Sequence, residues 1–297
     1  MSHSSYIIAG PTASGKSDFA HKLALRVNGV IINCDSVQIY SGIENISASP
    51  FAQKNIKEKI IDGVPYRLFS ILPLTEQITV ADYLEMARRE YDDVIKSGKT
   101  PIFVGGSGYY IGVLLNGISP IPNVSEQNRT RARQMVDVAP DAVKKLLPED
   151  FTATDPQRTA RALEVFLETG RPLSEWQDLP RRGAITPKPF KILINPHREI
   201  LLKRIADRIP KMLSGGAINE AHEVIKTGWD ENRAIGASEL CKFLRNEIDE
   251  KTAIENWITR TNQYAKRQRT WFRGQYAADF EISHIPTDTD VEIILSE

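Results

Sequence analysis

Residues 10–17 are the part of this sequence whose residue types and spacing most clearly indicate chemistry. They match the pattern G-x-x-x-x-G-K-S/T, in which glycines let backbone amides curl around phosphate oxygens. The lysine of such a loop adds a positive charge, and the next hydroxyl can hold a magnesium ion that bridges phosphate oxygens. We therefore predict a diphosphate or triphosphate site with Ser17 as the metal ligand. The predicted phosphate-binding residues are Gly10, Pro11, Thr12, Ala13, Ser14, Gly15, Lys16 and Ser17.

A phosphate loop of this kind lies between a buried strand and a helix, and the flanking sequence predicts both. Residues 6–9 are apolar, and residues 17–27 carry apolar side chains at helical spacing. A second apolar strand, over residues 30–34, delivers Asp35 at its carboxyl end, where α/β sheets keep their reactive groups. We therefore expect Asp35 to stand beside the phosphate loop.

Strand and helix patterns continue to alternate further along the chain. A helix is predicted over residues 80–94, followed by a strand over 101–104 that ends in the glycine turn 105–108. This alternation favours an α/β fold of the P-loop NTPase type, with a mostly parallel sheet flanked by helices.

The character of the sequence changes after residue 118. A proline-containing linker leads into helical patterns without a convincing strand, and we interpret residues 119–187 as an all-helical insertion. Residues 1–118 and 188–297 then form the P-loop core domain. An apolar strand at 190–194 is expected to resume the core sheet, and a long basic helix is expected at 252–271.

The composition excludes several classes of protein. Lys plus Arg equals Asp plus Glu at 38 each, so the whole chain has no bias toward polyanions. No apolar stretch approaches the ~20 residues needed to cross a bilayer, and the first residues lack the features of an export signal. The two cysteines are far apart and suggest neither a disulfide scaffold nor a zinc cluster. We expect a cytoplasmic monomer that does not associate with a membrane and has no obligate protein partner.

Basic residues nevertheless gather locally, for example at 129–133 and 266–273. Such clusters could follow the phosphate backbone of a nucleic acid. They could equally be solvated helix faces balanced by nearby acids, and the charge pattern alone leaves both interpretations open.

Five further segments carry motifs with a recognisable order. They are Asp35–Tyr40, Val104–Tyr110, Asp155–Val165, Ala234–Gly236 and Gln263–Arg273. Together with the phosphate loop they resemble the motifs of the tRNA dimethylallyltransferases, the IPP transferase family. The resemblance implies transfer of a dimethylallyl group from dimethylallyl diphosphate to the exocyclic amine of the adenosine 3′-adjacent to the anticodon in tRNA. The products would be isopentenyladenosine and diphosphate.

The resemblance also implies roles for individual residues. Lys16 and a Mg²⁺ ion on Ser17 would stabilise the leaving diphosphate, with Arg129 as a further diphosphate contact. Asp35 would accept the proton of the attacking amine, and Ser107 would hydrogen-bond near the reacting groups. The alternative for Asp35 is that it only holds magnesium through water.

Transfer to a base inside an anticodon loop requires that the base turn outward into the enzyme. The insertion is expected to grip the RNA, and the residues after the second strand are expected to recognise the turned base. The predicted tRNA-binding residues are Asp35, Ser36, Val37, Gln38, Ser107, Arg129, Gln157, Arg158, Thr159, Ala160 and Arg161.

The chain departs from the family pattern at several positions. Ser49 stands where a lysine is usual, and Asn262 replaces a usual arginine, so two positive charges are missing. Tyr66 and Arg67 occupy the place of a common pair of histidines, and Ser107 replaces a threonine while it keeps the hydroxyl. The first two changes put the strength of tRNA binding in question.

Three other functions remain to be separated from tRNA modification. A P-loop kinase could use Asp35 as the base for a small acceptor, although the strand at 101–104 ends in glycines where kinases commonly place a magnesium-binding acid. An adenylate isopentenyltransferase would act on free nucleotide and would have little use for the insertion. A non-enzymatic RNA-binding module would not need Lys16, Ser17 and Asp35 together.

Overall fold

The computed structural model describes residues 3–52, 59–148, 151–152 and 155–297. The chain divides into two compact units. The first unit consists of residues 1–115 and 185–297, and the second consists of residues 116–184.

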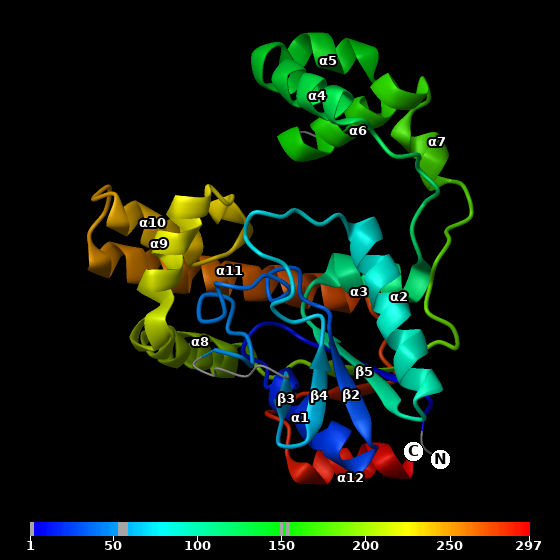
Figure 1. Cartoon of the computed structure of the whole chain (residues 1–297), viewed down its shortest axis with the longest axis vertical. Coiled ribbons are helices and arrows are strands. Elements are labelled where there is room, and N and C mark those ends of the chain that lie inside the picture. Colours follow the sequence, from blue (N-terminus) through cyan, green and yellow to red (C-terminus); the bar gives the residue numbers. More distant parts are fainter. Residues whose placement is uncertain (1–2, 53–58, 149–150, 153–154) are drawn as a thin grey trace. The chain divides into compact units, whose positions relative to one another are not determined.

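The first unit is built on a sheet of seven strands, in the order β3-β4-β2-β5-β1-β6-β7 (Figure 1). Neighbouring strands are parallel except for the edge pair β3 and β4, which is antiparallel. This confirms the predicted α/β fold with a mostly parallel sheet. The strands are β1 (Tyr6–Ala9), β2 (Gly29–Asn33), β3 (Ile60–Ile61), β4 (Val64–Arg67), β5 (Thr100–Gly105), β6 (Phe190–Ile194) and β7 (Phe280–Ile282).

Helices cover both faces of this sheet, which buries its strands as continuous apolar runs. On one face, Ile8 and Ile102 pack against Phe19 of α1 in the main core cluster. On the other face, Phe103 stacks on Tyr91 of α2 with ring centroids 6.2 Å apart. The helices of the first unit are α1 (Lys16–Arg26), α2 (Val80–Lys96), α3 (Gly108–Asn116), α8 (Arg198–Met212), α9 (Ile218–Thr227), α10 (Ala237–Leu244), α11 (Glu250–Gln275) and α12 (Asp288–Ser296).

Two short helical segments complete this unit. The π-helical segment η1 (Leu213–Ala217) joins α8 to α9, and Gly216 within it has a φ of 115°, a conformation that favours glycine. The 3₁₀ helix η2 (Glu231–Arg233) precedes α10.

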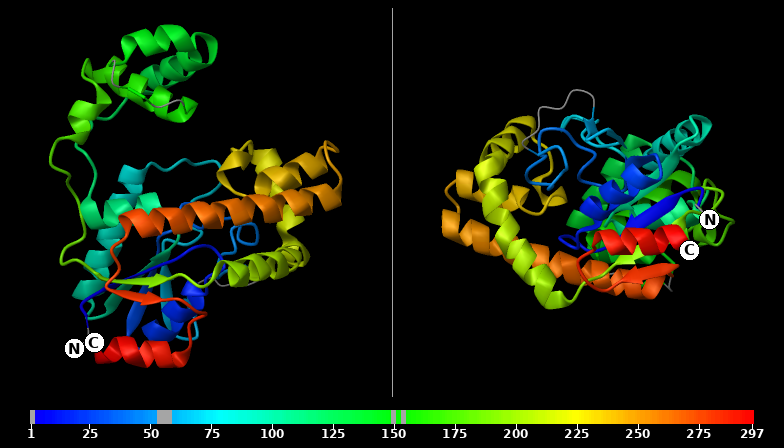
Figure 2. Two further views of the ribbon diagram at one scale, coloured as in Figure 1. Left: turned by 180° about the vertical axis from the view of Figure 1, so that it is seen from behind. Right: turned by 90° about the horizontal axis from the view of Figure 1, so that it is seen from below.

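The last part of the chain returns to the first strand. The Tyr276 hydroxyl, just after α11, donates a hydrogen bond to the Ile7 carbonyl of β1 at 3.2 Å. β7 then extends the sheet beside β6, and α12 packs on α1, where Lys22 and Asp288 form an ion pair of 2.8 Å. Figure 2 shows α12 in red beside the blue α1.

The second unit is all helical in its described part. It contains α4 (Glu126–Val138), α5 (Pro140–Leu146), α6 (Pro156–Thr169) and α7 (Leu173–Gln177). Its own small core includes Ala132, Val143 and Leu163. An isolated bridge between Ile118 and Arg182 ties the two ends of the unit together.

In the described part of the chain, no helix combines the length and the apolar character that crossing a bilayer requires.

Candidate active site

The predicted phosphate loop joins the end of β1 to the start of α1. Gly15 has a φ of 92°, which a residue with a Cβ rarely adopts, and a Cβ there would also meet Pro286 at 3.2 Å. A Cβ at Gly10 would lie 2.4 Å from the Ile194 carbonyl oxygen of β6. Both glycines of the motif are therefore required by backbone conformation or close packing.

Side chains from two helices distant in sequence, α8 and α11, hydrogen-bond with the loop. Arg204 of α8 donates from Nε to the Ala13 carbonyl at 2.8 Å. Gln268 of α11 accepts the Thr12 amide hydrogen at 2.8 Å, and Arg208 donates to the Thr12 hydroxyl at 2.9 Å. The Arg204 and Gln268 contacts occupy backbone groups in the first half of the loop, and the Arg208 contact occupies the Thr12 side chain.

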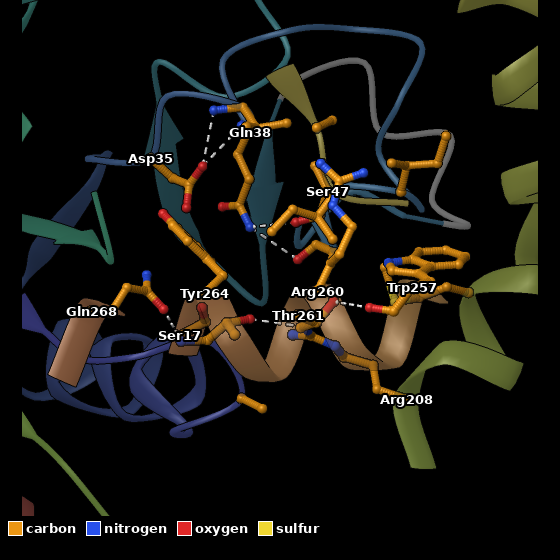
Figure 3. Close-up of a pocket in the computed structure, with 18 of the residues that line it drawn as sticks. Ser17, Asp35, Gln38, Ser47, Arg208, Trp257, Arg260, Thr261, Tyr264 and Gln268 are labelled. Carbon is orange, nitrogen blue, oxygen red and sulfur yellow. Dashed lines mark hydrogen bonds between the residues drawn. The ribbon is translucent and has the colours of Figure 1, made fainter. Parts of the chain in front are cut away.

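The loop and the segment after β2 line one cavity of about 700 Å³ in the first unit. Figure 3 shows side chains from α11 along one wall, with Gln38 and Ser47 opposite them. Among the lining residues are Thr12, Ala13, Gly15, Lys16, Ser17, Asp35, Ser36, Val37, Gln38, Ile46, Ser47, Ala48, Arg204, Arg208, Arg233, Ile235, Trp257, Arg260, Thr261, Tyr264 and Gln268.

Asp35 faces this cavity in a turn that fixes its side chain. Its Oδ1 accepts the amide hydrogens of Val37 and Gln38, with N···O distances of 2.9 and 3.4 Å. Asn33 braces the turn, since its side chain accepts the Asp35 amide hydrogen at 2.9 Å. Figure 3 shows the carboxylate pointing toward the hydroxyl of Tyr264.

The cavity holds positive charge that is poorly solvated. Burial lowers the pKa of Lys16 to about 8, although the negative charge of Asp35 partly opposes this shift and Arg208 adds to it. Burial likewise lowers the pKa of Arg208 to about 10. The Arg208 Nε is buried and has no hydrogen-bond partner among the described residues. An anion in the cavity would relieve both costs, as expected for a diphosphate site.

Gln38 lines the cavity, and Ser107 lies next to Ser36, which also lines it; the Ser107 hydroxyl and the Gln38 side-chain nitrogen already have partners. The Ser107 Oγ accepts the amide hydrogen of Ser36 at 3.2 Å. The Gln38 side-chain nitrogen donates to the carbonyls of Ser47 and Ala48 at 3.0 and 3.1 Å. Gln38 therefore secures the neighbouring loop through its amide hydrogens, and its oxygen is the atom that remains for recognition of a base.

The remaining predicted residues belong to the second unit. Arg129 on α4 lies 3.7 Å from Glu126, and its contact with diphosphate remains a prediction. On α6, Gln157 and Arg158 are exposed, while Arg161 pairs with Glu164 at 3.2 Å.

Two other predicted positions on α6 are engaged within the unit. The Thr159 hydroxyl donates to the Asp155 carbonyl at 2.9 Å. Ala160 lies in the core of the unit, so its side chain is not on the exposed face with Gln157 and Arg158.

Several cavity residues were not predicted from the sequence. Arg204 and Arg208 stand four positions apart on α8 and so share one face of that helix. Trp257 and Arg260 on α11 close the far wall, where Arg260 pairs with Glu239 of α10. The spacing of the two arginines after a predicted strand was the available signal for the first pair.

A metal ion would need ligands from the substrate in this cavity. No group of three or more His, Cys, Asp or Glu side chains able to hold a metal occurs among the residues that the structure describes. Ser17, exposed at the start of α1, supplies a hard oxygen of the kind that Mg²⁺ prefers. Such a site fits a magnesium ion that arrives with the diphosphate.

A family model described as IPP transferase matches residues 38–275, and a model described as Isopentenyl transferase matches residues 3–60. The chain belongs to the IPP transferase family. It is 39% identical to the tRNA dimethylallyltransferase of Zymomonas mobilis, over 92% of this chain and 88% of that protein. It is 37% identical to the tRNA dimethylallyltransferase of Rickettsia bellii, over 91% and 87% of the two chains.

Solved structures of family proteins share the fold. A tRNA isopentenylpyrophosphate transferase from Bacillus halodurans is 27% identical, with a TM-score of 0.67 over 99% of this chain and 95% of that chain. A eukaryotic dimethylallyltransferase acting on tRNA is 25% identical, with a TM-score of 0.70 over 91% of this chain and 70% of that chain.

Proposed function

We propose that the protein transfers a dimethylallyl group from dimethylallyl diphosphate to the exocyclic amine of the adenosine 3′-adjacent to the anticodon in tRNA. The observation that carries this proposal is one cavity lined by both the phosphate loop and Asp35. A diphosphate held by the loop brings its allylic carbon into the cavity that Asp35 faces. Membership of the IPP transferase family, with relatives named tRNA dimethylallyltransferases, supports the same reaction.

The leaving diphosphate gathers negative charge as the carbon–oxygen bond breaks. Lys16 and Arg208 are oriented toward the cavity and poorly solvated, so they can stabilise this charge without reorganising water. A Mg²⁺ ion, held by Ser17 and the diphosphate, would neutralise part of the same charge. Arg129 is a further proposed contact, supplied by the insertion.

The attacking amine is a weak nucleophile that becomes acidic as the new bond forms. Asp35 is the proposed proton acceptor, because its carboxylate faces the cavity and one of its oxygens is anchored by the Val37 amide. General-base assistance of this kind is typically worth about 10²–10⁴ in rate. Ser36, Val37, Gln38 and Ser107 are proposed to contact the turned base.

The second unit is the proposed grip on the RNA. Gln157 and Arg158 are exposed near the start of α6, where long polar side chains can reach phosphates or bases. Arg161 lies on the same helix, paired with Glu164, and an RNA phosphate would compete for its guanidinium.

A transfer assay tests the function against its rivals. The protein is mixed with Mg²⁺ and dimethylallyl diphosphate labelled in the dimethylallyl group, together with an anticodon stem-loop or AMP. A parallel reaction contains ATP labelled in its γ-phosphate and small hydroxyl acceptors. We expect the dimethylallyl label to move to the stem-loop alone. Labelled AMP would favour an adenylate isopentenyltransferase, and phosphorylated acceptors would favour a kinase.

A matched RNA gives the control for this assay. A stem-loop with guanosine at the target position has no exocyclic amine at the corresponding ring carbon and should remain unlabelled. Equal labelling of the two stem-loops would contradict attack by the adenosine amine.

A further inference from the structure

We propose that Tyr264 and Gln268 of α11 are positioning residues that keep three loops of the active site in fixed positions relative to one another. The three loops are the phosphate loop, the turn after β2 that carries Asp35, and the glycine turn that carries Ser107. This inference rests on the proposed function for its meaning in catalysis, but its central test measures diphosphate binding alone.

Gln268 connects two of these loops through one side chain. It is 6% exposed, its oxygen accepts the Thr12 amide hydrogen at 2.8 Å, and its nitrogen donates to the Gly106 carbonyl at 2.8 Å. A Cβ at Gly106 would lie 2.3 Å from that nitrogen, so a glycine is needed for this approach. A primary amide is the neutral side chain that supplies an acceptor and a donor from adjacent atoms.

Tyr264 lies one helical turn before Gln268 and faces the loop that carries Asp35. Its hydroxyl points toward the Asp35 carboxylate, and both side chains line the same cavity (Figure 3). The Ser107 Oγ accepts the amide hydrogen of Ser36 at 3.2 Å, and Ser36 is the residue that follows Asp35. Hydrogen bonds therefore run from Thr12 through Gln268 to the Gly106 carbonyl, and the next residue along the glycine turn, Ser107, holds the residue that follows Asp35.

The phenol of Tyr264 is suited to holding a position and unsuited to proton transfer. Burial raises the pKa of Tyr264 well above its usual value, and the negative charge of Asp35 raises it further. The hydroxyl consequently keeps its proton at neutral pH. Figure 3 shows Tyr264 and Gln268 on the same side of α11, facing the cavity.

Loss of either contact should displace a loop while the surrounding sheet stays intact. Without Gln268 the partly buried Thr12 amide loses its partner, and the loop would move to satisfy it. A misplacement of about 1 Å in a catalytic group can cost about 10²-fold in rate. Gln268 bonds the phosphate loop directly, whereas Tyr264 faces Asp35, so their removal should affect different steps.

The test compares Gln268→Met and Tyr264→Phe with the wild-type protein. Gln275→Met is the matched control, since Gln275 is exposed at the end of the same helix. Calorimetry measures the affinity for inorganic diphosphate with Mg²⁺, and the transfer assay gives kcat and KM. We expect Gln268→Met to weaken diphosphate binding about tenfold and to raise the KM for dimethylallyl diphosphate. Tyr264→Phe should lower kcat about tenfold with diphosphate affinity within about twofold of wild type.

Other outcomes overturn the inference. If Gln268→Met binds diphosphate as well as Gln275→Met does, Gln268 does not position the phosphate loop. If Tyr264→Phe loses kcat and diphosphate affinity by the same factor, its effect is general and not directed at the Asp35 side. If the wild-type protein binds diphosphate but transfers nothing to the stem-loop, the proposed function fails, whereas the expected loss of affinity in Gln268→Met still supports the role of Gln268.

Discussion

Replacement of Asp35 by asparagine tests the proton-accepting role of the carboxylate separately from its role in the shape of the turn. The amide oxygen of Asn at position 35 can still accept the hydrogen bond from Val37, which is 2.9 Å long in the native turn. The turn should therefore keep its shape while the group loses its ability to take a proton. We expect kcat to fall by about 10²–10⁴, the range for loss of a general base. That range corresponds to about 2.7–5.4 kcal/mol of transition-state stabilisation.

The diphosphate affinity of this variant must be measured at a pH at which Lys16 is protonated in both proteins. The charge of Asp35 helps to hold the pKa of Lys16 at about 8, so its removal should lower that pKa further. At pH 6.5 Lys16 stays protonated in both proteins, and calorimetry there should give equal or slightly tighter diphosphate binding for Asp35→Asn. Asp92→Asn, on the exposed side of α2, is the matched control.

Either of two results would contradict the role of Asp35 as the proton acceptor. A kcat within about tenfold of wild type would mean that the amine needs no proton acceptor at this position. A loss of diphosphate affinity equal to the loss of kcat would mean that Asp35 acts on ground-state binding, for example by holding magnesium through water.

Two further predictions follow from the phosphate loop and the sheet. Because the pKa of Lys16 is about 8 in the free protein, a bound diphosphate should raise it, and affinity should fall by up to about tenfold as pH rises from 8 to 9. Calorimetry of Lys16→Arg should show a flatter profile over this interval, and an unchanged slope would contradict the assignment. Gly105→Ala should destabilise the fold by about 1–3 kcal/mol or more in urea unfolding, since the new Cβ would lie 1.9 Å from the Cys34 carbonyl oxygen. Gly274→Ala, with open space around it on α11, should be neutral or stabilising.

The chemistry-bearing loops were predictable because their signals are local. The phosphate loop is one contiguous motif, and Asp35 follows a short apolar strand directly. Parallel strands place their carboxyl ends along one edge, so two separate segments could be expected side by side without any knowledge of distant contacts. The four central strands of the sheet, β2, β5, β1 and β6, were predicted for the same reason, as compact apolar runs.

The edges of the sheet and the outer wall of the site were harder to predict. β3 and β7 have two and three residues, too few for a periodic pattern to emerge, and Pro65 interrupts β4. The roles of Arg204 and Gln268 depend on partners about 190 and 256 positions away. Arg204 looks like an ordinary helix position in the sequence, and Gln268 stands out only as a member of the motif Gln263–Arg273. Only the folded chain shows that both side chains meet the phosphate loop.

The pairing of β1 with β6 and the return of Tyr276 to Ile7 have a consequence for biosynthesis. The phosphate loop is translated well before the strands that flank its own, because β1 gains its first neighbour only with residues 100–105 and its second only with residues 190–194. Its supports Gln268 and Pro286 are translated later still. Such non-local contacts slow folding and leave an open strand edge on the nascent chain. The phosphate-binding end of the sheet therefore stays incomplete until nearly all of the first unit has been translated, and such incomplete edges are prone to aggregation.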